Sequence, residues 1–193
     1  MKAEQAFIEQ YPAVYQHLLQ YKDKLSARNK AETGIRYEWY TLQRWGANYW
    51  DLLSQPKIIW GEISDKSKFC IDIHGEYVPE ATTFMLSGKE LPYLLAFLNC
   101  SVSEYLFSII GTTTGVGTVR WKKYKILELP VPKSIPDDLY SQLLEVCNQT
   151  IRSGYDDSLE YNINSIIYQV YGLTAEEIEF IESKLYPSKS SSL

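Results

Sequence analysis

Apolar residues recur at two different spacings along the first 110 residues of the chain. After Pro12 the apolar positions follow helical spacing as far as Leu25, and proline is favourable in the first turn of a helix, so a helix is predicted over residues 12–28. Short runs rich in β-branched and aromatic residues, bounded by turn residues, predict strands at 57–63, 69–73 and 82–86. Two apolar stretches, 90–99 and 101–110, predict buried helices.

A glycine-rich segment follows these elements. Residues 111–117 contain three glycines and predict a flexible loop. Residues 123–132 have a strand-like pattern that two prolines end. We therefore expect a loop that leads into a basic strand.

The last third of the chain has a helical pattern. Beyond Pro136, apolar residues keep helical spacing in three successive segments; Gly172 is suited to end the second, and Thr174 with Glu177 matches a capping box for the third. The whole pattern predicts an α+β (mixed α/β) fold, with a small curved β-sheet and packed helices followed by a C-terminal helical segment. The predicted parts are a domain at 1–133, the helical segment at 134–186 and a disordered tail at 187–193.

The composition fits one globular domain with an appended helical segment. The chain has 193 residues, of which 45% are hydrophobic, and this is enough to bury a core. No apolar run reaches the roughly 18 residues of a membrane span, and the N-terminus lacks a signal-peptide pattern, so we expect a soluble, cytoplasmic protein. Cys70, Cys100 and Cys147 lack the spacing of a disulfide framework or a zinc site, and we expect them to be buried as small hydrophobic residues.

The net charge of −5 is unevenly distributed. Residues 1–125 hold 15 Lys and Arg against 13 Asp and Glu, a balance of +2, whereas residues 126–193 hold 4 against 11, a balance of −7. Charges more than about 10 Å apart are largely screened at ordinary ionic strength, so an acidic protein can still carry a basic surface. The acidity belongs to the C-terminal part of the chain.

The pattern lacks the residues of a self-contained catalytic centre. His17 and His74 have no neighbouring Cys, His or carboxylate arrangement typical of a metal site. Neither glycine-rich nucleotide-binding motif occurs, and Pro136-Asp137 has no partner strand with the Glu-x-Lys pattern of metal nucleases. We expect no catalytic residue and no metal ligand in this chain.

The glycine loop and the basic residues after it form the first candidate binding segment. Threonine hydroxyls and glycine amides are able to bind phosphate oxygens while neighbouring cations supply charge. An ordinary glycine-rich hairpin loop is the alternative interpretation. The candidate phosphate-binding residues are Thr112, Thr113, Thr114, Arg120, Lys122 and Lys123.

A second candidate segment lies at residues 34–53, where Arg36, Gln43 and Arg44 are interleaved with six aromatic residues. Arginine and glutamine side chains pair with guanine and adenine edges in the major groove, and aromatic rings stack on unpaired bases. We expect most of the aromatic residues to pack in the core. The two arginines and the glutamine remain candidates for base recognition.

Six segments of the chain, taken in order, resemble the landmarks of one known family. The match covers about residues 7–183 and resembles the TaqI-like C-terminal specificity domain, which is the target-recognition domain of type IIG restriction-modification enzymes and related large adenine-N6 DNA methyltransferases. The segments are YPAVYQHLLQYKDKLSAR, WYTLQR, YWDLLSQPKIIWGEIS, ELPYLLAFLNCSVSEYLF, GTTTGVGTVRWKKYKILELPVP and INSIIYQVYGLTAEEIEFIE.

This resemblance implies that residues 1–133 recognise a sequence in double-stranded DNA for a bacterial restriction-modification system. S-adenosylmethionine and Mg²⁺ would then serve methyltransferase and nuclease domains of the same or a partner polypeptide, because no motif for either chemistry occurs in this chain. The resemblance therefore implies that this chain holds no cofactor and is not an enzyme by itself.

Two other functions stay open at this point. The chain could be a protein-interaction module that docks a partner through its acidic helical tail, with the basic segments merely solvated. A nuclease or methyltransferase activity of the chain itself comes third.

Overall fold

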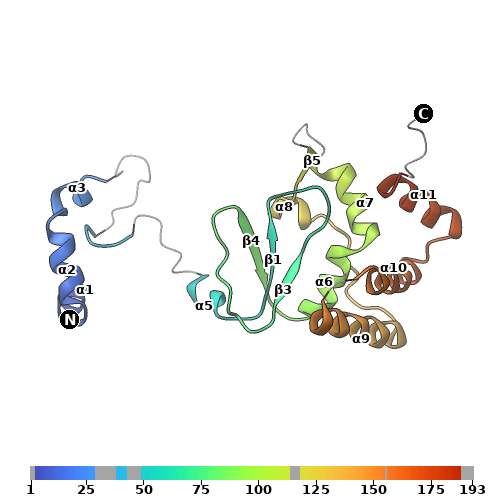
Figure 1. Cartoon of the computed structure of the whole chain (residues 1–193), viewed down its shortest axis with the longest axis horizontal. Coiled ribbons are helices and arrows are strands. Elements are labelled where there is room, and N and C mark those ends of the chain that lie inside the picture. Colours follow the sequence, from blue (N-terminus) through green and yellow to red (C-terminus); the bar gives the residue numbers. More distant parts are fainter. Residues whose placement is uncertain (1–2, 29–37, 43–48, 114–117, 155, 188–193) are drawn as a thin grey trace. The chain divides into compact units, whose positions relative to one another are not determined.

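The structure is a computed structural model that describes residues 3–28, 38–42, 49–113, 118–154 and 156–187 (Figure 1). It divides the chain into two compact units, Met1–Asn48 and Tyr49–Leu193. Of the described residues, 56% are helical and 12% lie in strands, and these strands form two small antiparallel sheets of three strands each. The predicted α+β class, with a C-terminal helical segment, is therefore confirmed.

The first unit begins with three short helices, α1 (Ala3–Gln10), α2 (Pro12–Leu19) and α3 (Lys22–Ser26). Pro12 occupies the first turn of α2, as predicted. The predicted single helix over residues 12–28 is interrupted, because the backbone N–H of Gln20 bonds to the carbonyl of Leu18 and closes a tight turn before α3.

The larger sheet of the second unit has the order β3-β1-β4, with β1 (Lys57–Gly61) between β3 (Cys70–Asp72) and β4 (Thr83–Ser87). Both pairings are antiparallel, and Ile58 lies opposite Ile71 on one side and Leu86 on the other. A short helix, α5 (Trp50–Leu53), precedes β1. The three predicted strands are thus present, and the central one carries the fully buried Ile58.

Strand β1 also carries a buried cation. The Nζ atom of Lys57 lies 2.6 Å from Oδ2 of Asp72, and both side chains are almost fully buried. Lys57 also donates to the backbone carbonyls of Leu53 and Gln55, while four backbone N–H groups at residues 74–77 donate to Asp72. Burial opposes ionisation of Asp72, but the hydrogen bonds from Lys57 and the backbone outweigh it and hold the pKa of Asp72 below its ordinary value.

The smaller sheet has the order β2-β6-β5, formed by β2 (Ile63–Ser64), β6 (Val119–Arg120) and β5 (Thr112–Thr113). Strand β2 comes from the segment after β1, and β5 and β6 come from the two ends of the glycine-rich segment. The helix α8 (Lys123–Ile126) follows β6.

The strand predicted over residues 123–132 is wrong. Residues 123–126 form the helix α8, and the buried residues Ile126 and Leu129 lie three positions apart, which is the spacing of one helical turn. A strand would have placed these two side chains on opposite faces of the chain.

Helices α6 (Leu91–Asn99) and α7 (Ser101–Ile110) occupy the centre of the second unit and confirm the two predicted helices (Figure 1). The predicted burial holds for most of α6, whereas α7 is buried only in part and exposes Ile109. Together they contribute to both hydrophobic cores of the unit. The sheet core contains Ile58, Trp60, Phe69, Leu95, Leu98, Phe107, Trp121, Ile126 and Leu129. The C-terminal core contains Ala96, Phe97, Val102, Leu143, Cys147, Ile163, Ile167 and Ile181.

Within the described ranges, no single helix is long and apolar enough to cross a membrane. Helices α6 and α7 reach the length and apolar composition of a membrane span only when they are taken together, and they are bent by 64° relative to each other.

Three helices complete the second unit: α9 (Asp137–Ser153), α10 (Asp157–Tyr171) and α11 (Ala175–Leu185). Gly172 ends α10 with a left-handed backbone (φ 64°), and Thr174 and Glu177 form the predicted capping box at the start of α11. The division predicted after residue 133 stays a prediction, and residues 188–193 of the predicted tail lie outside the described residues.

The three cysteines differ in exposure. Cys100 and Cys147 are buried, as predicted, and burial raises the pKa of Cys147 to about 12. The prediction is wrong for Cys70, which is exposed. Its neighbour Ile71 packs against the sheet core, and because side chains alternate along a strand, Cys70 points to the opposite face of the edge strand β3.

Candidate nucleic-acid interface

The small sheet brings three of the predicted binding residues together. Arg120 lies directly opposite Thr112 on one side and Ile63 on the other, and Thr113 lies opposite Val119. Residues directly opposite each other in a sheet share a face. Thr112 and Thr113 are exposed, and Arg120 and Ile63 are at least partly accessible. One face of the small sheet therefore presents a guanidinium and a threonine hydroxyl to solvent.

The charge of Arg120 is shared with a carboxylate. Its Nη1 atom lies 2.8 Å from Oε1 of Glu62, and the two side chains are 41% and 28% exposed. An ion pair at this degree of exposure contributes little to stability, typically about 0–1 kcal/mol. Arg120 is therefore able to bind an anion at low cost, but it is not an uncompensated cation.

Lys122 and Lys123 carry the uncompensated charge of this region. Lys123 is exposed and Lys122 is partly exposed, and in the part of the chain that the structure describes neither forms an ion pair. Lys125, by contrast, is paired with Glu128 at 3.1 Å. The two lysines adjoin the exposed Tyr124, so a short segment presents two ammonium groups and a phenol hydroxyl to solvent.

The backbone in front of the two lysines is firmly held. The Trp121 indole is stacked on Phe107, and its backbone N–H donates to the carbonyl of Glu62 at 2.6 Å. The indole N–H of Trp60 donates to the carbonyl of Trp121 at 2.8 Å. Since side chains that project from a fixed backbone lose less entropy on binding, this anchoring favours a preformed interface.

Gly111 allows the close approach that forms the small sheet. A Cβ atom at this position would lie 2.6 Å from the carbonyl oxygen of Phe107 and 2.7 Å from Cγ1 of Val119. Only glycine fits between the end of α7 and β6, so this glycine has a steric role in placing β5 beside β6.

Four of the predicted binding residues, Arg36, Gln43, Arg44 and Thr114, lie outside the described residues. The other five are Thr112, Thr113, Arg120, Lys122 and Lys123, and they lie on β5, on β6 or directly after β6. The base-recognition role predicted for residues 34–53 stays a prediction.

The described aromatic residues of that segment divide between core and surface. In the first unit Trp39 is buried, and its indole N–H donates to Glu4 at 2.9 Å. The ammonium of Lys22 lies over the Trp39 ring, 5.1 Å from its centroid. Arg28 donates to the carbonyls of Trp39 and Thr41, so it serves the fold of this unit. In the second unit Tyr49 and Trp50 are exposed.

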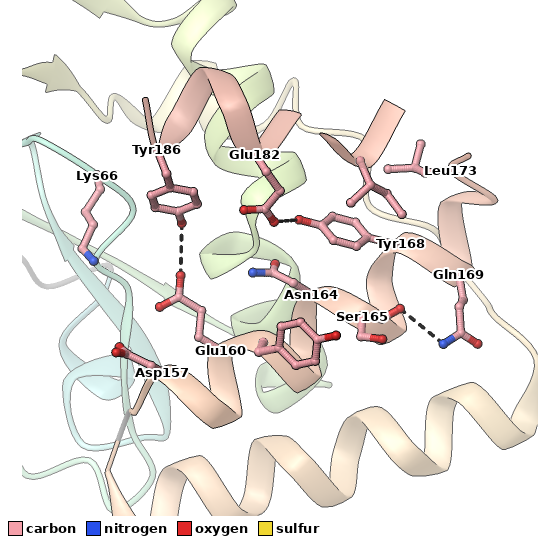
Figure 2. Close-up of a pocket in the computed structure, with 12 residues that line it drawn as sticks. Lys66, Asp157, Glu160, Asn164, Ser165, Tyr168, Gln169, Leu173, Glu182 and Tyr186 are labelled. Carbon is pink, nitrogen blue, oxygen red and sulfur yellow. Dashed lines mark hydrogen bonds between the residues drawn. The ribbon is translucent and has the colours of Figure 1, made fainter. Parts of the chain in front are cut away.

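Two features of the second unit were not predicted from the sequence. Tyr124 is an additional candidate contact beside the lysines, but only the folded chain shows that it is exposed. A cavity of about 710 Å³ lies between α10 and α11 and is lined by carboxylates and tyrosines (Figure 2). The acidity of this part of the chain was apparent from the sequence, but the convergence of these side chains requires the packing of the two helices.

No group of three or more His, Cys, Asp or Glu side chains in the described ranges is arranged to hold a metal ion. Comparison with protein-family models gives no match, and comparison with curated proteins gives none either.

Proposed function

We propose that this chain recognises double-stranded DNA, as the specificity domain of a restriction-modification adenine methyltransferase or endonuclease. The supporting observation is that Lys122 and Lys123, which have no carboxylate partner among the described residues, project from an anchored backbone close to the exposed threonines of β5. The sequence resemblance to TaqI-like specificity domains supports the same function and supplies the restriction-modification context.

The phosphate backbone is the first feature of DNA that such a surface meets. Lysine ammonium groups, threonine and tyrosine hydroxyls and backbone N–H groups are the usual donors to phosphate oxygens, and they position a protein on the duplex. Thr112, Thr113, Lys122, Lys123 and Tyr124 provide this set within a short stretch of the second unit. Arg120 joins them by exchanging Glu62 for a phosphate or a guanine edge.

Base recognition is assigned in this proposal to Arg36, Gln43 and Arg44 together with Arg120. The chemistry of methyl transfer and cleavage, with its S-adenosylmethionine and Mg²⁺, is assigned to other domains of the same or a partner polypeptide. The chain would act in the bacterial cytoplasm and would not be an enzyme by itself.

Fluorescence anisotropy of a labelled mixed-sequence duplex tests the proposal with a matched pair of double variants. Lys122→Gln with Lys123→Gln should weaken binding and lower the salt slope of log K by about 1.8, which corresponds to two lost phosphate contacts. Lys89→Gln with Lys133→Gln removes the same charge from two exposed lysines, one shortly before α6 and one shortly before α9, and should leave the affinity unchanged.

Two outcomes would contradict DNA recognition. One is the absence of binding by the full chain at low salt and high protein concentration. The other is an equal loss of affinity in the two double variants, because this would indicate a diffuse charge effect in place of a defined surface. Circular dichroism of all variants checks that the fold is intact.

A second candidate function is the docking of a partner protein through the acidic C-terminal helices. The specific observation in its favour is the carboxylate-lined cavity between α10 and α11. The lysine variants distinguish the two functions, because only DNA recognition requires Lys122 and Lys123.

A further inference from the structure

The cavity between α10 and α11 has a volume of about 710 Å³, which is enough for a long side chain and the backbone around it. Its walls come from the two helices, and Lys66 of the segment after β2 lies at its rim. Figure 2 shows that the polar ends of Glu160, Asn164, Glu182 and Tyr186 converge on the same space.

Two carboxylate–tyrosine pairs stand on either side of this space. The hydroxyl of Tyr186 donates to Oε1 of Glu160 at 3.2 Å, and the hydroxyl of Tyr168 donates to Oε1 of Glu182 (Figure 2). Burial is the main cause that raises the pKa of both phenols, that of Tyr186 to about 12, so both keep their protons at neutral pH. Each carboxylate therefore accepts one hydrogen bond from a phenol hydroxyl and retains free lone pairs for a ligand.

The formal charge of the lining selects the sign of a ligand. Asp157, Glu160 and Glu182 face a single cation, Lys66, which leaves a balance of −2. A phosphate or a nucleotide would be repelled here, whereas an organic cation would be attracted. The cavity therefore favours positively charged ligands, whereas the lysine-bearing surface beside β5 favours negatively charged ones.

Asn164 adds a hydrogen-bond donor to the acidic lining. Its side chain is held by the backbone N–H of Ser101, which donates to Oδ1 at 2.8 Å, and the residue is only 7% exposed. The Nδ2 atom is directed into the cavity in Figure 2, and it makes no hydrogen bond to the described residues. A ligand that carries an acceptor as well as a positive charge would therefore complement this lining.

We propose that this cavity binds an arginine residue of a partner polypeptide. The guanidinium lies between Glu160 and Glu182 and donates to both carboxylates, while a main-chain carbonyl beside the arginine accepts from Nδ2 of Asn164. Arginine fits better than lysine because its planar fork of donors bridges two carboxylates and stacks on tyrosine rings, whereas an ammonium supplies only a point charge.

This inference does not depend on DNA recognition, and it gives the second candidate function a defined site. A partner domain that supplies the arginine would cover the acidic helices. The lysine-bearing surface beside β5 shares none of the lining residues of the cavity, so the two binding events have separate tests.

Isothermal titration of the full chain with the capped peptide acetyl-Gly-Arg-Gly-amide tests the proposal. The matched ligand contains citrulline, which keeps the shape of arginine and removes its charge. The citrulline peptide should bind at least about tenfold more weakly, because its interactions with the carboxylates are no longer charge-assisted. Binding of the two peptides with equal affinity, or no binding of the arginine peptide at millimolar concentration, would overturn the proposal.

A matched pair of variants on α11 assigns the binding to the cavity. Glu182→Gln should weaken the arginine peptide by about tenfold, whereas Glu179→Gln, an exposed glutamate on the same helix that does not line the cavity, should leave it unchanged. Glu160→Gln provides a second variant if Glu182→Gln alters the circular dichroism of the chain. Equal effects of the Glu182 and Glu179 substitutions, or binding of adenosine monophosphate in preference to the arginine peptide, would contradict the assignment.

Discussion

The indole of Trp121 lies flat against the ring of Phe107, with ring centroids 4.0 Å apart and an angle of 7° between the ring planes. Trp121 immediately precedes Lys122 and Lys123, so a contact in the sheet core determines where the two candidate DNA-binding lysines leave the fold. The anchoring and the proposed DNA binding thus involve adjacent residues, and mutations can test them separately.

Trp121→Ala should destabilise the second unit by about 3–5 kcal/mol, because it removes a buried aromatic ring and leaves a cavity beside Phe107. Chemical denaturation measures this change in the free energy of unfolding. Tyr124→Ala, at a residue that is 56% exposed, serves as the control and should change the stability by less than about 0.5 kcal/mol. A small effect of Trp121→Ala would show that the stacking does not support this segment.

Tyr124→Phe should weaken DNA binding by about 1 kcal/mol if the exposed hydroxyl donates to a phosphate, since this is the net value of one neutral hydrogen bond. The salt slope should stay unchanged, because no charge is removed. Anisotropy titrations at several salt concentrations measure both quantities. A change in slope equal to that of the lysine variants would be inconsistent with this role.

Asp72→Ala should destabilise the protein by about 3–5 kcal/mol, because it leaves Lys57 buried without its counterion. Asp65→Asn is the matched comparison, since the exposed pair of Asp65 with Lys68 is surrounded by solvent, and we expect no measurable change there. Thermal or urea unfolding of both variants provides the measurement.

The same aspartate should make stability depend on pH. The pKa of Asp72 is lower in the folded chain than in the unfolded chain, where it is near 3.8, so the unfolded chain binds the proton more readily. The contribution of Asp72 is therefore fully present above the unfolded pKa and is lost as the pH falls through the lower, folded pKa. Asp72→Asn should flatten the curve of unfolding free energy against pH below about pH 4, and an unchanged curve would contradict the assignment.

Gly111→Ala should destabilise the chain by about 1–3 kcal/mol, because its Cβ atom would meet the Phe107 carbonyl and the Val119 side chain. Gly61→Ala is the control, since the nearest heavy atom to its Cβ atom would be the carbonyl oxygen of Ile63 at 4.0 Å, an ordinary contact. Urea unfolding of the two variants tests whether the close approach at Gly111, and not the loss of a glycine as such, is responsible. Similar values for the two variants would reject the steric explanation.

The helices of the second unit could be predicted because their signals are local. Leucine spacing located α6, and the pair Thr174 and Glu177 located the start of α11, since a capping box involves residues only three positions apart. The strands β1, β3 and β4 were also located by short β-branched runs. The local pattern was enough to locate these elements, although the strands pair with residues far away in the sequence.

The errors concern residues whose environment is created by distant parts of the chain. Residues 123–126 are helical where a strand was predicted, because Ile126 and Leu129 both face the sheet core behind Trp121. The burial of Lys57, about which the sequence analysis made no prediction, likewise depends on Asp72, which is fifteen positions away on the neighbouring strand β3. The periodicity of the sequence alone shows neither the core that Ile126 and Leu129 face nor the counterion of Lys57.

The candidate site was predicted in part. The β5–β6 pairing brings Thr112, Thr113 and Arg120 together, whereas Arg36, Gln43 and Arg44 lie outside the described residues. The α10–α11 cavity was not predicted, because its carboxylates become neighbours only when two helices pack. Charge counts identified the acidic segment but not the cavity between its helices.

Helix α6 contributes to both hydrophobic cores, and this has a practical consequence for protein engineering. Phe97 belongs to the C-terminal core, whereas Leu98, the next residue of the same helix, belongs to the sheet core. A chain cut after residue 133 would lose Leu143, Ile163 and Ile167, which share a core with Phe97, and would expose the α6 side of that core to water. Transplanting the lysine-bearing segment into another protein therefore requires carrying α9 to α11 with it.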